Sequence, residues 1–140
     1  MARHDRTPLR LLILVTPDFN VATTMAFVDP FRAANDLDGT RHFRWSFASE
    51  QGGDCPSSNG GAIAATPLAH VLRAEVDAVI VSSNWAPERH AAPVLRSALR
   101  RWGRHDVLLS GLDTGAFVLA QAGLLDGRAA TVHYEHIDDL

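Results

Sequence analysis

Residues 106–120 read DVLLSGLDTGAFVLA, and this stretch decides the fold. The aliphatic run at 106–110 is typical of a strand that is covered on both faces, whereas 114–122 has the pattern of a helix. Between them, Gly-Leu-Asp-Thr-Gly at 111–115 fits the frame of a G-x-S-x-G elbow, with Asp113 at its centre. The stretch therefore predicts one strand, turn and helix of a parallel α/β sheet.

The same alternation of strands and helices extends outward from this unit. A loop rich in Gly, Ser, Pro and Asn at 51–61 can enclose a short hairpin, and Pro30 is expected to bend or restart the first helix. The sequence predicts a three-layer α/β sandwich with a mostly parallel sheet. We expect strands at 9–15, 43–48, 77–82, 106–110 and 128–132, and helices at 21–35, 67–73, 87–103, 114–122 and 134–140.

Length and composition favour a single intracellular domain. The chain has 140 residues, 46% of them hydrophobic, a formal net charge of -3 and one cysteine. We expect no internal disulfide, a cytoplasmic location, no membrane contact and no strong binding of nucleic acid by this piece alone. Residues 1–8 are expected to be a flexible terminus and residues 9–140 the domain. Because no closing strand follows the last helix, we expect the domain to be truncated at its C-terminus.

Ligands of parallel α/β sheets bind at the carboxyl ends of the strands. The stretches at 17–20, 82–85 and 111–115 occupy such ends, and Asp113 lies at the crest of the last one. One interpretation is that Asp113 caps the following helix through the N–H groups of Gly115 or Ala116. Alternatively, Asp113 recognises a ligand. Catalysis is the least favoured interpretation, because a carboxylate is a weak nucleophile.

His133 lies 20 residues after Asp113 and is placed so that it could return beside it as a base. A structural or ligand-bonding role is the favoured interpretation, because the elbow has no thiol or hydroxyl for His133 to activate. His133 and His136 also have the spacing of a metal pair, but a zinc site needs further ligands. We therefore expect no metal and no cofactor, and we interpret Cys55 as a bystander thiol.

Three segments together resemble a known family. GLDTGAFVLAQAGLLDGRAATVHYEH at 111–136, NVATTMAFVDPFRAANDLDG at 20–39 and SSNWAPERH at 82–90 resemble ThiJ/PfpI-like domains fused to AraC-type DNA-binding domains, of the GlxA-like group. The resemblance covers nearly the whole chain from residue 11 on. It implies a flavodoxin-like fold of the class I glutamine amidotransferase-like type, a homodimer, and DNA contact only through a C-terminal helix-turn-helix domain outside these 140 residues.

The resemblance also implies a non-catalytic effector domain. Superfamily enzymes carry a reactive cysteine at the position that matches Asp113, together with a histidine that matches His133. The Asp113 elbow, FVDPFRAAN at 27–35 and TVHYEHID at 131–138 look most like the subgroup that controls catabolism of glycine betaine, carnitine and related quaternary amines.

An effector of this type is bound by aromatic faces and a carboxylate. Phe19, Trp85 and Tyr134 lie at or near the strand ends, Asp113 offers the charge, and the effector's own carboxylate would meet N–H groups after Asp113. The predicted ligand-binding residues are Phe19, Asn20, Trp85, Asp113, Thr114, Gly115, His133 and Tyr134.

Two other functions stay open. One is a dehalogenase-like enzyme with Asp113 as covalent nucleophile and His133 as base; the other is a scaffold that only dimerises.

Overall fold

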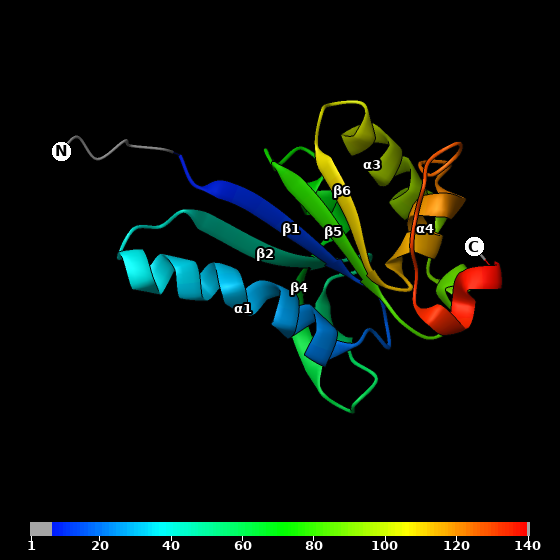
Figure 1. The fold of residues 1–140 in the computed structure, drawn as a ribbon, viewed down its shortest axis with the longest axis horizontal. Helices are drawn as coiled ribbons and strands as arrows, with labels where there is room; N and C mark the ends of the chain where they lie inside the picture. The colour runs from blue at the N-terminus through cyan, green and yellow to red at the C-terminus, as the bar shows by residue number, and fades with distance from the viewer. Residues whose placement is uncertain (1–6, 140) are drawn as a thin grey trace.

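Six strands form one sheet, in the order β3-β4-β2-β1-β5-β6 (Figure 1). The structure is a computed structural model that describes residues 7–139. All neighbouring strands are parallel except β3 and β4, which form an antiparallel hairpin. The predicted α/β fold is therefore confirmed. The strands are β1 Leu9–Val15, β2 Phe43–Ser49, β3 Gly53–Pro56, β4 Ala62–Pro67, β5 Ala78–Ser83 and β6 Leu108–Asp113.

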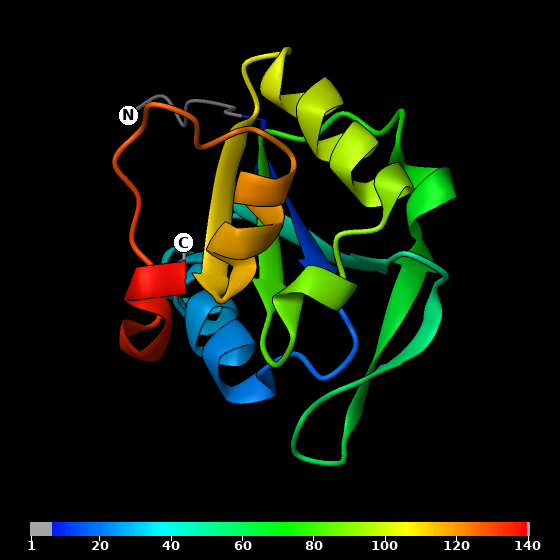
Figure 2. The ribbon, with the colours of Figure 1, turned by 90° about the vertical axis from the view of Figure 1, so that its right-hand side faces the viewer.

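Helices cover both faces of this sheet. Successive side chains of a strand point to opposite faces, so Leu11, Ile13 and Val15 pack toward α1, in a core that also contains Val28. Leu12 and Leu14 belong to the core on the other face, with residues of α3 and α4 (Figure 2). The helices are α1 Val21–Asp38, α2 Leu68–Val71, α3 Pro93–Gly103 and α4 Gly115–Gln121, with 3-10 turns η1 Pro87–Arg89 and η2 Tyr134–Asp139.

The first helix is longer than the sequence predicts. Its N-cap is Asn20, whose side chain accepts a hydrogen bond from Thr23 N at 3.2 Å. The helix continues past Pro30 without a restart and ends at Gly39, which has the left-handed φ of 62° that a helix end of this kind requires. Asn20 is thereby held at the carboxyl edge of the sheet.

Four other element predictions need correction. The predicted helix at 87–103 is divided into η1 and α3, because Pro87 and Pro93 each begin a helical segment. The hairpin in the loop at 51–61 is present, but it includes an unpredicted strand, β4.

The predicted strand at 128–132 is wrong. In the described residues the sheet ends at β6, and this segment has no strand partner. The helix expected from residue 134 is a 3-10 turn, and Leu140 and residues 1–6 of the expected flexible terminus lie outside the described residues.

Candidate functional site at the carboxyl edge of the sheet

Asp113 lies at the crest of a tightly packed elbow between β6 and α4. Its φ is 57°, in the left-handed region that non-glycine residues seldom adopt. A Cβ at Gly111 would lie 2.6 Å from Ala116 N, and a Cβ at Gly115 would collide with the carbonyl oxygen of Val81. Both glycines are therefore required by close packing of the elbow, as the G-x-S-x-G frame predicts.

The carboxylate of Asp113 contacts α1 and not the helix that follows it. Asn20 Nδ2 donates a hydrogen bond to Asp113 Oδ2 at 3.4 Å. The N-cap of α4 is Thr114, which makes no side-chain capping bond. Instead, the Thr114 hydroxyl donates to Asn84 O at 2.6 Å. The interpretation of Asp113 as a helix cap is wrong, because Thr114 occupies the N-cap position and the Asp113 carboxylate accepts from Asn20 instead.

Strained backbone conformations mark three neighbouring strand ends. Asp18 (φ 62°), Ala86 (φ 51°) and Asp113 (φ 57°) follow or end β1, β5 and β6 respectively. Such conformations are held by the surrounding structure and cluster at functional sites. Three of the four non-glycine residues with a positive φ in the described part of the chain thus lie at the carboxyl edge, and the fourth, Asp106, precedes β6 at the opposite edge.

The predicted aromatic residues occupy different environments. Phe19 is 0% exposed and packs in the core under α1, so no face of its ring is open. Trp85 and Tyr134 are 65% and 73% exposed. Thr114 and Gly115 are buried in the elbow.

His133 lies next to Tyr134, with ring centroids 4.5 Å apart. Its Nδ1 is 3.7 Å from the Glu135 carboxylate. No hydrogen bond or ion pair of the described residues joins His133 to Asp113.

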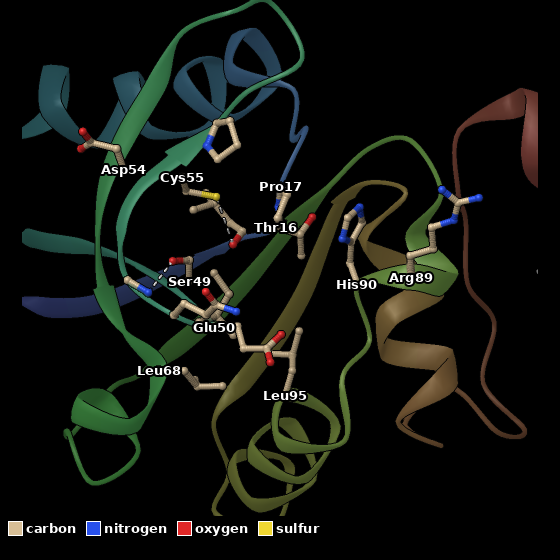
Figure 3. Close-up of a pocket in the computed structure, with 15 residues that line it drawn as sticks. Thr16, Pro17, Ser49, Glu50, Asp54, Cys55, Leu68, Arg89, His90 and Leu95 are labelled. Carbon is tan, nitrogen blue, oxygen red and sulfur yellow. Dashed lines mark hydrogen bonds between the residues drawn. The ribbon is translucent and has the colours of Figure 1, made fainter.

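A cavity of about 340 Å³ lies at the carboxyl ends of β1 and β2, and we call it the β1–β2 cavity (Figure 3). Sequence reasoning missed it because only the ends of β1, β5 and β6 were considered, whereas Ser49 and Glu50 at the end of β2 form one wall. The β3–β4 hairpin, α2, η1 and α3, with the residues next to them, complete the lining of the cavity: Gly52, Asp54, Cys55, Leu68, Arg89, His90 and Leu95.

Cys55 lines this cavity and is 5% exposed. Burial, and secondarily the charge of Asp18, raise the pKa of its thiol. A protonated, buried thiol is a poor nucleophile, in keeping with its interpretation as a bystander. Within residues 7–139, no three His, Cys, Asp or Glu side chains are grouped so that they could hold a metal ion. The helices of the same range include none with the length and apolar character needed to cross a membrane.

Comparison with solved structures establishes the class of fold. No protein-family model matches the chain. The structure is similar to the ThiJ/PfpI domain protein of Brachyspira murdochii, with a TM-score of 0.77 over 94% of this chain and 75% of that one, at 13% identity. It is also similar to an AraC family transcriptional regulator of Pseudomonas putida, with a TM-score of 0.80 over 94% of this chain and 70% of that one, at 27% identity.

Sequence comparison shows which curated proteins contain a similar domain. The chain is 39% identical over 125 residues to the HTH-type transcriptional regulator CdhR of Pseudomonas aeruginosa, covering 89% of this chain but only 37% of the regulator. Its curated homologues are thus HTH-type transcriptional regulators, and its fold is shared with an AraC family regulator and with a ThiJ/PfpI domain protein. The chain spans less than half the length of the curated regulators that it matches.

Proposed function

We propose that this chain is the ligand-sensing and dimerisation domain of an AraC-family transcriptional regulator, and that it binds its effector without chemical conversion. Asp113 carries the proposal: a carboxylate at the crest of a strained elbow, bonded to Asn20 and not to a histidine. We take it to stand where enzymes of the superfamily have a reactive cysteine. A carboxylate attacks only activated substrates, but it binds cations well.

The effector in this proposal is a small quaternary amine or an amino-acid-like metabolite. The carboxylate of Asp113 supplies the charge for its cationic group, and the exposed rings of Trp85 and Tyr134 supply aromatic faces. Asn20 and His133 complete the polar contacts. Phe19 is buried in the core under α1, and Thr114 and Gly115 are buried in the elbow itself.

Dimerisation and DNA binding belong to the same proposal. The dimer is proposed from the resemblance to regulators and not from a surface patch: the exposed apolar side chains Leu37, Leu108 and Ile137 lie at the end of α1, at the start of β6 and in η2, and are not one contiguous surface. DNA would be contacted by a helix-turn-helix domain outside these residues, in the cytoplasm. Light scattering of the purified chain tests the dimer: a monomer at all accessible concentrations contradicts it.

Calorimetric titration with glycine betaine, dimethylglycine and carnitine tests effector binding. We expect one of them to bind and Asp113→Asn, which removes the charge but keeps the shape, to weaken it by about tenfold or more. The matched control is Asp126→Asn, which removes the same charge from an exposed loop. Equal affinity of the wild type and Asp113→Asn would remove Asp113 from the site.

A hydrolytic enzyme is the second candidate function. The carboxylate of Glu135 lies near His133 Nδ1, at 3.7 Å, which is an ion-pair distance and longer than the hydrogen bond that orients a catalytic base. In such an enzyme Asp113 would attack the carbon of an alkyl halide and form an ester as the halide ion leaves, and His133 would activate the water that hydrolyses the ester. Intact-mass measurement of His133→Gln, which could not hydrolyse the ester, after incubation with alkyl halides decides between the two functions: a mass gain that the additional change Asp113→Asn abolishes supports the enzyme, and an unchanged mass supports the sensor.

A further inference from the structure

We infer that Thr24 and Ser82 are positioning residues of the elbow: their hydroxyls hold the first turn of α1 so that the Asn20 side chain lies against Asp113. Both hydroxyl side chains are fully buried, so they would act on an effector only through Asn20. The inference rests on the proposed function of the elbow, but the hydrogen bonds that carry it are those of the unliganded chain.

A continuous chain of hydrogen bonds leads from β5 to the elbow. Ser82 Oγ and Thr24 Oγ1 lie 2.7 Å apart. The Thr24 hydroxyl donates its one proton to Asn20 O at 2.7 Å, so Ser82 is the donor to Thr24. Asn20 Nδ2 in turn donates to Asp113 Oδ2 at 3.4 Å. A strand residue of the core is thereby connected to the carboxylate of the proposed site.

Asn20 has little freedom once the first turn of α1 is fixed. Its Oδ1 accepts from Thr23 N at 3.2 Å, and its backbone carbonyl accepts from both the N–H and the hydroxyl of Thr24. Because the side-chain amide is planar, fixing Oδ1 at the helix N-terminus also fixes the direction of Nδ2. Any rotation or shift of this turn therefore moves Nδ2 relative to Asp113.

The apolar contacts of α1 leave such a shift open. Val28 packs on the sheet with residues such as Ile13 and Ile80, but hydrophobic contact is not directional. The Asn20–Asp113 bond cannot fix the helix either, because 3.4 Å exceeds the usual upper length of about 3.2 Å for an N–H···O bond. The short bond between Thr24 and Ser82 is therefore the one that sets the position of the turn.

The next residue of β5 provides a matched control. Ser83 is as fully buried as Ser82, but it points to the opposite face of the sheet, because successive side chains of a strand alternate. Its hydroxyl accepts from Thr16 Oγ1 at 3.0 Å and so ties β5 to the end of β1, not to α1. Ser82→Ala and Ser83→Ala each remove one buried hydroxyl from the same strand, and only Ser82→Ala releases α1.

The first test needs no effector. Asp113→Asn should shift the side-chain amide resonances of Asn20, because Nδ2 donates to that carboxylate. In a chain that also carries Ser82→Ala, the same Asp113→Asn change should move these resonances by less than half as much. With Ser83→Ala the shift should equal that in the wild-type background. A mere loss of stability would not produce this difference, because the spectra report the folded chain.

The second test is calorimetry with whichever of glycine betaine, dimethylglycine and carnitine binds. Ser82→Ala and Thr24→Val should each weaken binding about fivefold. Thr24→Ser, which keeps the hydroxyl, and Ser83→Ala should stay within about twofold of the wild type. Asn20→Ser keeps a capping oxygen but removes the donor to Asp113. In that background Ser82→Ala should have no further effect on affinity.

Three outcomes overturn the inference. They are an equal loss of affinity in Ser82→Ala and Ser83→Ala, an undiminished response of the Asn20 amide to Asp113→Asn in the Ser82→Ala chain, and a further loss of affinity from Ser82→Ala in the Asn20→Ser chain. If none of the three effectors binds, the proposed effector class is wrong, and the first test still decides whether Ser82 positions Asn20.

Discussion

The elbow and the β1–β2 cavity lie at the same edge of the sheet but are built from different parts of the chain. The elbow is shaped by backbone: two glycines pressed against neighbouring strand and helix, and a left-handed Asp113. The cavity has an apolar core base, while its polar character comes from partly exposed side chains at its rim. Substitutions of the elbow glycines should therefore change stability, whereas those of partly exposed side chains at the cavity rim should leave it nearly unchanged.

The largest expected effect is that of Gly115→Ala. Because the added Cβ would collide with the carbonyl oxygen of Val81 on β5, α4 must move, and the free energy of unfolding should fall by about 3 kcal/mol. Urea denaturation measures the change. Gly127→Ala is the control: its φ of 69° is strained for alanine but the space around it is open, so a loss of about 1 kcal/mol is expected. If Gly115→Ala and Gly127→Ala lose the same unfolding free energy, close packing at Gly115 does not determine the conformation of the elbow.

Thr114→Val should have the next largest effect. The hydroxyl of this buried side chain donates to Asn84 O at 2.6 Å and so joins the elbow to the loop that leads to η1. Valine keeps the shape but leaves the carbonyl without this donor, which should cost about 2 kcal/mol of unfolding free energy. Thr131→Val at an exposed position serves as the control. If Thr114→Val loses no more unfolding free energy than Thr131→Val does, solvent must replace the hydrogen bond to Asn84 O.

Backbone strain at Asp113 predicts a smaller effect with a definite sign. Asp113→Gly should be more stable than Asp113→Ala by about 1 kcal/mol, because glycine adopts a φ of 57° without steric cost. Both variants should lose effector binding, since both lack the carboxylate. Thermal unfolding measured for the pair tests the strain. If the alanine variant is the more stable of the two, the left-handed conformation of the elbow is contradicted.

The ion pair between Arg10 and Asp77 lies outside the elbow and the β1–β2 cavity and should make stability depend on pH. Arg10 Nε donates to Asp77 Oδ2 at 3.0 Å, and the backbone N–H of Arg10 donates to the same oxygen at 2.8 Å. These bonds hold the pKa of Asp77 below its ordinary value. A depressed carboxyl pKa stabilises the fold above the unfolded value of about 3.9, and this stability is lost as the pH falls through the folded pKa.

Asp77→Asn should therefore lower the unfolding free energy at neutral pH, by a small amount because the pair is partly exposed. The difference from wild type should narrow as the solution is acidified from pH 5 toward pH 3. Urea titrations at several pH values measure it. A difference that is independent of pH would contradict the ion pair as the cause.

The strands and the elbow could be predicted because their signals are local. Leu9–Val15 is an aliphatic run whose predicted bounds match those of β1. The two glycines of the elbow likewise indicate its close packing from the sequence. The division at 87–93 was missed although the sequence carries its signal, since Pro93 lies inside the predicted helix and proline favours the start of a helix over its interior. The segment at 128–132 has a strand-like composition, but strand formation depends on a neighbouring strand that the described residues do not provide.

The candidate site was accessible to sequence reasoning only in part. Asp113 and Asn20 could each be placed at a strand end, but their hydrogen bond joins residues 93 positions apart. The β1–β2 cavity depends on where the β3–β4 hairpin and η1 settle against the sheet, which no local pattern reports. Its residues Glu50 and His90 look in the sequence like ordinary solvated side chains.

The most direct test of recognition at the elbow is an NMR titration that follows the side-chain amide of Asn20. This amide donates to the Asp113 carboxylate, so a cationic effector held by Asp113 must change its resonances. With glycine betaine, dimethylglycine or carnitine, whichever binds by calorimetry, we predict a saturable shift of the Asn20 amide that is absent in Asp113→Asn, with no change in protein mass. Saturable binding that leaves the Asn20 amide unmoved would contradict the account.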